Sequence, residues 1–117
     1  MSTEENKALY RRWIQAGKEK ALDQIDELFA PDFVDHFTPP GAPTGREWVR
    51  QMVKETSPDV QTTIEDMIAE GDQVWARVVV RNNNTPNTPQ GNLYLADMVR
   101  IADGKIAEHW GIIQPLP

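Results

Sequence analysis

The sequence predicts a single small α+β domain spanning residues 1–117, with three N-terminal helices packed on one face of a curved, mainly antiparallel sheet. Its length of 117 residues is that of one domain. Apolar residues recur at helical spacing in the first half of the chain. From residue 60 onward apolar and polar residues alternate with a period of two, as in strands. Helices followed by an antiparallel meander are typical of the α+β class.

Two helices are expected before the first strand. Ser2 and Glu5 form a capping box at the start of the first helix, which we expect to end at Gly17. Apolar positions predict a second helix over about residues 19–29. Pro31 follows this segment, and the residue before a proline avoids the helical region, so we expect the helix to stop here.

The remaining elements follow from changes in periodicity and from breaker residues. Residues 33–37 form a short strand-like run, and a stiff loop rich in proline and glycine leads to a third helix that begins at Gly45. The asparagine- and proline-rich residues 82–90 predict a loop. The strands expected after the third helix cover residues 60–69, 73–81, 93–101 and 105–113.

Composition restricts the possible partners and the location of the protein. Hydrophobic residues make up 39% and charged residues 26%, as in an ordinary globular protein. Without an apolar run of about 20 residues or a signal-peptide pattern, we expect a soluble, cytoplasmic protein with no membrane partner. The net charge of −6 repels phosphate, so we expect no nucleic acid partner. The absence of cysteine excludes disulfides and thiolate chemistry.

Four stretches of the chain contain motifs of one family. Residues 29–36 are FAPDFVDH, residues 69–77 are AEGDQVWAR, residues 97–110 are DMVRIADGKIAEHW, and the chain ends in IQPLP. In this order they resemble the SnoaL-like polyketide cyclases of the nuclear-transport-factor-2-like (NTF2-like) superfamily, and the tail resembles the SnoaL-like aldol-condensation enzymes.

The resemblance implies both a shape and a chemistry. The shape is a cone-shaped α+β barrel, in which a curved sheet wraps helices around a mostly apolar cavity and the convex face often forms a dimer. The chemistry is ring closure of a polyketide-like ester by intramolecular aldol addition, without a metal or cofactor. The expected partners are therefore a small hydrophobic molecule and a second copy of the chain.

The register of the last hairpin decides which side chains share a face. A two-residue turn at residues 103–104 would place Asp97 opposite Trp110. A three-residue turn at residues 102–104 would instead place Asp97 opposite His109. We favour the second register, because it gives an apolar stripe interrupted by one carboxylate, as expected of a pocket wall. The stripe comprises Leu93, Leu95, Asp97, Val99 and Ile101.

Asp97 is the first catalytic candidate. Desolvation among aliphatic side chains should raise the pKa of this carboxyl, and a neighbouring imidazolium would lower it again. Asp97 could then act as a general base toward a carbon acid, or as an acid toward the oxygen of an aldol product. The alternative is a structural carboxylate, with a salt bridge to one of the arginines Arg77, Arg81 and Arg100.

The two histidines are the other catalytic candidates. His109 could carry a proton or donate a hydrogen bond to an enolate oxygen, or be a half-exposed strand residue. His36 could orient the substrate or a water molecule, or cap the proline-rich loop. A metal would require both histidines together with Asp35 or Asp97, a set without recognised spacing, so we expect no metal.

A substrate-binding set is expected around these groups, although an apolar helix stripe is also what a core would contain. Its members are Trp13, Phe37, Trp48, Met52, Leu95 and Gly111. Trp110 has the opposite parity to His109 and should lie on the convex face, where Trp75 could join it. Exposed tryptophans on that face would indicate a homodimer.

Gly111 departs from the pattern of the family that the chain resembles. Relatives with this hairpin usually have aspartate here, which in the cyclases is the acid/base group, and glycine cannot perform that role. Three interpretations stay open: Asp97 and His109 perform the chemistry, the pocket is enlarged for another substrate, or catalysis is lost. A glycine within a strand also indicates close approach by a ligand or another backbone.

Three functions are compatible with these features. The first is a cofactor-independent lyase or isomerase that acts on a carbon acid, by aldol-type cyclisation or isomerisation of a small hydrophobic or polyketide-like substrate. The second is a non-catalytic domain that binds a small hydrophobic ligand. The third, an epoxide hydrolase, needs two carboxylates and an arginine around a water molecule, and the second carboxylate is missing from the set built around Asp97.

Overall fold

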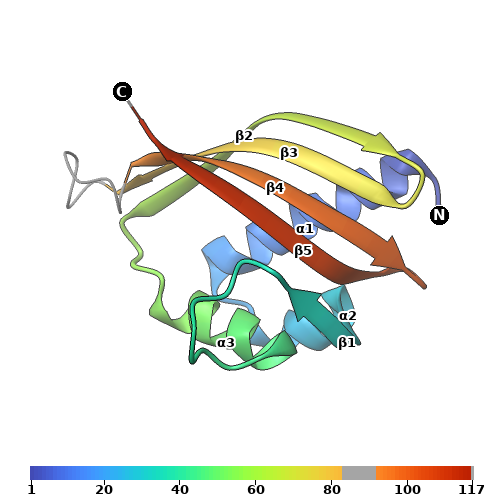
Figure 1. Ribbon diagram of the computed structural model, residues 1–117, viewed down its shortest axis with the longest axis horizontal. Helices are drawn as coiled ribbons and strands as arrows, with labels where there is room; N and C mark the ends of the chain where they lie inside the picture. The colour runs from blue at the N-terminus through green and yellow to red at the C-terminus, as the bar shows by residue number, and fades with distance from the viewer. Residues whose placement is uncertain (83–91, 117) are drawn as a thin grey trace.

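The chain folds into helices packed against one five-stranded sheet (Figure 1). The computed structural model describes residues 1–82 and 92–116, so the loop predicted at residues 82–90 lies, apart from Asn82, outside the described residues. The elements in chain order are α1 (Thr3–Glu19), the 3₁₀ turn η1 (Leu22–Gln24), α2 (Ile25–Leu28), β1 (Phe29–Asp35), α3 (Gly45–Glu55), β2 (Val60–Glu70), β3 (Gln73–Asn82), β4 (Leu93–Ala102) and β5 (Lys105–Pro115).

The sheet has the strand order β1-β5-β4-β3-β2. Strands β2 to β5 form the predicted antiparallel meander, while β1 pairs in parallel with β5 at one edge. In Figure 1 the four long strands arch over α1 and α3, with the short β1 below β5. This arrangement confirms the predicted α+β fold with helices on a curved, mainly antiparallel sheet.

The core lies between the helices and one face of the sheet. From β3 it takes the alternate residues Val74, Ala76 and Val78, which are buried, whereas Trp75 and Arg77 between them are exposed. The helices contribute Leu9 and Leu28, among others, to the same cluster. The period-two pattern of the sequence therefore marks correctly which face of β3 is buried.

The first helix begins as predicted but ends later. The side chain of Ser2 accepts a hydrogen bond from the backbone of Glu5 at 3.1 Å, and the Glu5 carboxylate accepts one from the backbone of Ser2. The helix continues through Gly17 to Glu19 and ends at Lys20, whose φ of 55° is left-handed. The backbone N–H of Lys20 donates to Ala16 and Gly17, an arrangement that terminates the helix.

The prediction for residues 19–37 is wrong in its element boundaries. The segment expected to be one helix contains only η1 and α2, and the first strand covers Phe29–Asp35 instead of residues 33–37. The strand includes Pro31, which lacks the N–H needed for a ladder. This is tolerated because β1 is an edge strand whose register with β5 is irregular between Phe29 and Val34.

The hairpin between β4 and β5 combines features of both predicted registers. Asp103 and Gly104 form a two-residue turn, with φ of 52° and 75°, that pairs Ala102 with Lys105. An irregularity after Ile101 then shifts the pairing by one residue.

This shift makes the favoured register wrong. Asp97 lies opposite Gly111, and His109 lies opposite Val99. The two-residue turn alone would have placed Asp97 and His109 on opposite faces of the sheet. The bulge shifts the pairing by one residue and so returns them to the same face. Asp97 and His109 therefore still share a face, as the favoured register required.

The sheet face away from the helices has a row of large apolar side chains. Ile68, Trp75, Met98 and Trp110 are cross-strand partners in sequence from β2 to β5, which confirms that the two tryptophans share a face. Ile68 is 65% and Trp75 is 51% exposed. We call this row, together with Ile112, the outer sheet patch.

No helix in the described part of the chain is long and apolar enough to cross a membrane. The cytoplasmic location stays a prediction.

Two matched valine-to-alanine substitutions, one in the core and one at the edge of the sheet, should lower the free energy of unfolding by different amounts. Val78 has no exposed surface, so Val78→Ala should lower the free energy of unfolding by about 2 kcal/mol or more, from lost burial and a residual cavity. Val34 on β1 is 48% exposed, and Val34→Ala should cost less than about 1 kcal/mol. Urea denaturation of both variants measures the difference, and equal losses would contradict this placement of the core.

Candidate active site

Four polar side chains form a continuous chain of hydrogen bonds in the interior, which we call the acid/base cluster. The Tyr10 hydroxyl donates to Oδ2 of Asp97 at 2.5 Å. Oδ1 of Asp97 lies 2.6 Å from Nε2 of His109. Nδ1 of His109 lies 2.9 Å from Oδ1 of Asp35. Because each ring nitrogen faces a carboxylate oxygen, both donate when the ring is protonated.

Each member of the acid/base cluster comes from a different element. Tyr10 is on α1, Asp35 ends β1, Asp97 is in β4 and His109 is in β5. Asp35 is paired with His109 across the parallel β1–β5 ladder, which places the two side chains side by side. The backbone N–H of Phe37 also donates to Asp35 Oδ1 at 2.8 Å and holds its carboxylate in place.

The cluster is buried, and this changes how its members ionise. Burial alone would lower the pKa of His109, but the hydrogen bonds to Asp35 and Asp97 and their negative charges outweigh it and raise the pKa to about 9. Burial, followed by the charge of Asp97 and the hydrogen bond to it, raises the pKa of Tyr10 well above its usual value. At neutral pH His109 is therefore an imidazolium and Tyr10 a neutral donor.

A cavity of about 460 Å³ gives access to this cluster, and we call it the main cavity. Asp35, Asp97 and His109 form its polar inner end. Lys18, Lys20 and Pro58, which are exposed, line it near the end of α1 and the segment after α3, so the cavity opens there. Its other walls are mostly apolar and include Trp13, Ile14, Phe37, Val49, Met52, Val53, Val80 and Leu95.

The structure brings most of the predicted site residues together. Asp97 and His109 are in contact, and Trp13, Phe37, Met52 and Leu95 line the main cavity with them. The edge of the Trp13 ring packs on His109, with ring centroids 5.0 Å apart. Asp97 bonds to Tyr10 and His109, so its partners are not the arginines considered from the sequence.

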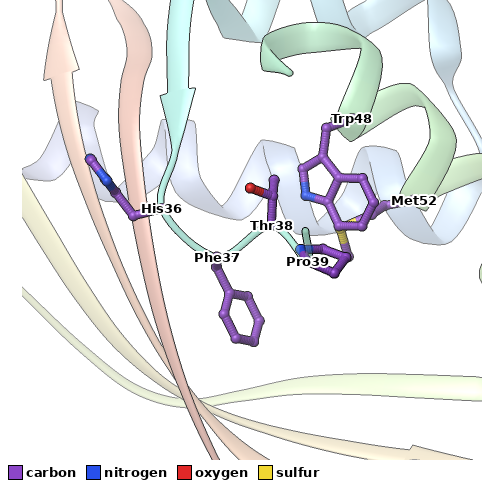
Figure 2. Close-up of a pocket in the computed structure, with 6 residues that line it drawn as sticks. All are labelled: His36, Phe37, Thr38, Pro39, Trp48 and Met52. Carbon is purple, nitrogen blue, oxygen red and sulfur yellow. The ribbon is translucent and has the colours of Figure 1, made fainter. Parts of the chain in front are cut away.

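His36 lies apart from the acid/base cluster. Its Nε2 is 2.6 Å from Glu108 Oε2, and its ring stacks on Trp110 at a centroid distance of 5.0 Å. These partners place it on the opposite face of β5 from His109, although it lines a second cavity with Trp48. Figure 2 shows His36 directed away from Phe37, Trp48 and Met52.

Gly111 is in direct contact with Phe37. A Cβ atom at Gly111 would lie 2.8 Å from Cδ1 of the Phe37 ring, closer than side chains pack. The close approach expected at this glycine is therefore made by a side chain. The ring fills the space that a side chain at residue 111 would take, so the missing side chain does not enlarge the cavity at this point.

Two members of the cluster were not among the predicted catalytic residues. Tyr10 belongs to the apolar stripe of α1, and nothing in the sequence distinguishes it from a core tyrosine. Asp35 was considered only as a metal ligand. The alternation of side chains along the strand could have identified Asp35 as inward-facing. Asp35 lies two residues after Phe33 in the same strand, so both share a face, and Phe33 is buried.

The epoxide hydrolase arrangement is not formed by the described residues. Asp35 is a second carboxylate near Asp97, but the two carboxylates flank His109 instead of a water molecule beside an arginine. Arg77 pairs with Glu65, and Arg100 with Glu108, outside the main cavity.

The architecture and the site together define a cone-shaped α+β domain with an internal cavity that ends in a buried acid/base cluster. The SnoaL-like domain family matches residues 10–109, and the chain belongs to this family. No curated protein matches its sequence.

Solved structures support the same assignment. A proposed polyketide cyclase from Bacillus cereus aligns with a TM-score of 0.81 at 25% identity, over 97% of this chain and 79% of that protein. IdmH, a proposed polyketide cyclase from Streptomyces antibioticus, aligns with a TM-score of 0.74 at 30% identity, over 93% and 91%. An NTF2-like protein from Mesorhizobium loti, at 21% identity over 96% and 93% with a TM-score of 0.74, supports the fold alone.

The raised pKa of His109 predicts how stability depends on pH. A group whose pKa rises from about 6.5 in the unfolded chain to about 9 in the folded protein stabilises the fold fully below pH 6.5. That contribution is lost as the pH rises toward 9, and it corresponds to on the order of 3 kcal/mol. Urea denaturation between pH 6 and 10 should show this loss, and His109→Gln should remove it. An NMR titration in which His109 loses its proton below pH 7 would contradict the assignment.

Proposed function

We propose that the protein is a cofactor-independent enzyme that acts on a carbon acid, with Asp97 as the acid/base group in an apolar cavity. The observation that carries the proposal is the contact between Asp97 and His109 at the inner end of the main cavity. Buried titratable groups within hydrogen-bonding distance of each other at the end of a cavity are typical of sites that catalyse proton transfer. The family and the similar polyketide cyclases favour an aldol-type reaction of a small hydrophobic or polyketide-like substrate.

The proposed step needs one proton and no redox partner. Asp97 removes a proton from the carbon next to a substrate carbonyl and leaves an enolate. The enolate carbon then forms a bond with a second carbonyl of the same molecule, and that carbonyl's oxygen becomes an alkoxide. Asp97 returns the proton to the alkoxide, so the carboxylate is regenerated. An isomerisation would use the same carboxylate to move the proton between two carbons.

The position of Asp97 supports this assignment despite Gly111. Cyclases that this chain resembles have their acid/base aspartate at the position of Gly111, which is the direct cross-strand partner of Asp97. Cβ atoms of such partners lie about 5 Å apart, so a carboxylate on either strand reaches the same part of a cavity. In this proposal the acid/base carboxylate lies on β4, at Asp97, instead of on β5, at residue 111.

Replacing the Asp97 carboxylate tests the proposal. Asp97→Asn keeps the shape but cannot accept a proton, so kcat/KM should fall roughly 100-fold or more. A panel of aromatic ketones and keto esters is screened by NMR for exchange of the acidic C–H in D2O and for new carbon–carbon bonds. Asp32→Asn is the control, because Asp32 is an exposed carboxylate on β1, and it should leave the rates unchanged. If the Asp97→Asn variant converted every substrate found at an unchanged rate, this role of Asp97 would be refuted.

A second candidate function is the binding of a small hydrophobic ligand without chemistry. The observation that favours it is the absence of the usual family carboxylate at residue 111, where the Phe37 ring now lies. Recovery of a tightly bound ligand that stays unconverted on prolonged incubation with the protein would favour this function, and turnover would exclude it.

We also propose that the protein forms a homodimer through the outer sheet patch. Ile68, Trp75 and Ile112 are each more than half exposed on this face. A contiguous apolar surface of this kind is typical of an interface.

A charge placed in the patch should disrupt the dimer. Trp75→Glu would bury an unpaired carboxylate in each half of the interface, so it should shift the protein toward the monomer. The control Ala8→Glu adds the same charge at an exposed position of α1 and should leave the mass unchanged. Light scattering at micromolar concentration measures both. A monomeric mass for the unmodified protein would contradict the proposal.

A further inference from the structure

A second cavity of about 430 Å³ lies beside the main one. It is lined by His36, Phe37, Thr38, Pro39, Trp48 and Met52, which come from the loop after β1 and from α3 (Figure 2). Phe37 and Met52 also line the main cavity, so these two side chains are the wall between the two spaces. The second cavity is therefore adjacent to the acid/base cluster without containing any of it.

The second cavity has an unused hydrogen-bond donor. The indole Nε1 of Trp48 is buried, and it has no hydrogen-bond partner among the described residues. Figure 2 shows the nitrogen edge of this indole turned toward Thr38 and Pro39, across the space they line with it. A buried donor without a partner destabilises the protein, and binding an acceptor oxygen would satisfy it.

The remaining surfaces of the second cavity suit an apolar group. Phe37, Pro39, Met52 and the face of the Trp48 ring present hydrocarbon, ring and thioether surfaces. Small-molecule sites typically combine such walls with a few polar groups that fix orientation.

We propose that the second cavity is a substrate subsite for an apolar, preferably aromatic, group that carries a carbonyl oxygen, which accepts a hydrogen bond from Trp48 Nε1. The proposal rests on the function proposed above and specifies its substrate. The substrate is long enough to occupy both cavities, with its reacting carbon at Asp97 and a ketone or ester oxygen at Trp48. Phe37 and Met52, which line both cavities, contact the part of the substrate that joins the two groups.

Two probes of the same shape test the donor directly. Acetophenone has a carbonyl oxygen where ethylbenzene has a methylene group. In a ¹H–¹⁵N spectrum the Trp48 indole N–H signal should move downfield as acetophenone is added, whereas ethylbenzene should produce no such downfield shift. The Thr38 amide signal reports occupancy of this cavity, because Thr38 lines only the second cavity.

Matched substitutions separate the hydrogen bond from packing. Trp48→Phe should weaken acetophenone binding, followed at Thr38, roughly 5- to 10-fold and should change ethylbenzene binding less than about 2-fold. Trp75→Phe is the control, because it also removes an indole N–H, one that donates to Gln73 outside both cavities, and it should change neither affinity.

The proposal is overturned if Trp48→Phe keeps the preference for acetophenone over ethylbenzene. It is also overturned if acetophenone moves the Thr38 signal but leaves the Trp48 indole signal in place, or moves neither signal. Asp97→Asn should leave binding at Thr38 unchanged, because Asp97 lines only the main cavity. Failure of this subsite is therefore distinguishable from failure of the acid/base proposal.

Discussion

The buried imidazolium of His109 between two carboxylates is the interaction on which the arrangement of this protein depends. Moving a charge out of water costs several kcal/mol unless partners replace the lost hydration. Here Asp35 and Asp97 accept from the two ring nitrogens, Phe37 N–H donates to Asp35, and the Tyr10 hydroxyl donates to Asp97. Removing His109 would leave two buried carboxylates without a counter-charge, and removing either carboxylate would leave one ring nitrogen without its partner. Since the members come from α1, β1, β4 and β5, these elements must all be in place together.

The same hydrogen bonds assign the chemical roles. Both N–H groups of His109 are used by carboxylates and the Tyr10 hydroxyl points at Asp97, so neither residue is free to act directly on a substrate. Asp97, like Asp35, borders the main cavity and receives two donors, which for Asp97 are Tyr10 and His109. Those donors orient its carboxylate, and its oxygens keep further lone pairs that can accept a proton. In the function proposed above, His109 and Tyr10 are then positioning residues, and Asp97 is the group that acts on the substrate.

Sequence patterns predicted the first and third helices, the antiparallel meander and the apolar stripe of β4, because those follow from local periodicity. Asp97 stood out because it is a carboxylate in an apolar stripe. The pairing of Asp97 with Gly111 could not be predicted, since the irregularity after Ile101 depends on how both strands pack and not on the turn residues alone. Tyr10 and Asp35 were missed as cluster members for a related reason: their role depends on contacts 87 and 74 positions away along the chain.

The exchange of a carboxylate for glycine at residue 111 is best understood together with Phe37. Without a Cβ at Gly111, the Phe37 ring lies against β5, 6.1 Å from the His109 ring centroid. An apolar ring at this distance lowers the local polarity beside His109, and hydrogen bonds are stronger in less polar surroundings. Phe37 is also part of the wall shared by the two cavities. Gly111 therefore leaves room for the Phe37 ring, which lies beside His109 and lines both cavities.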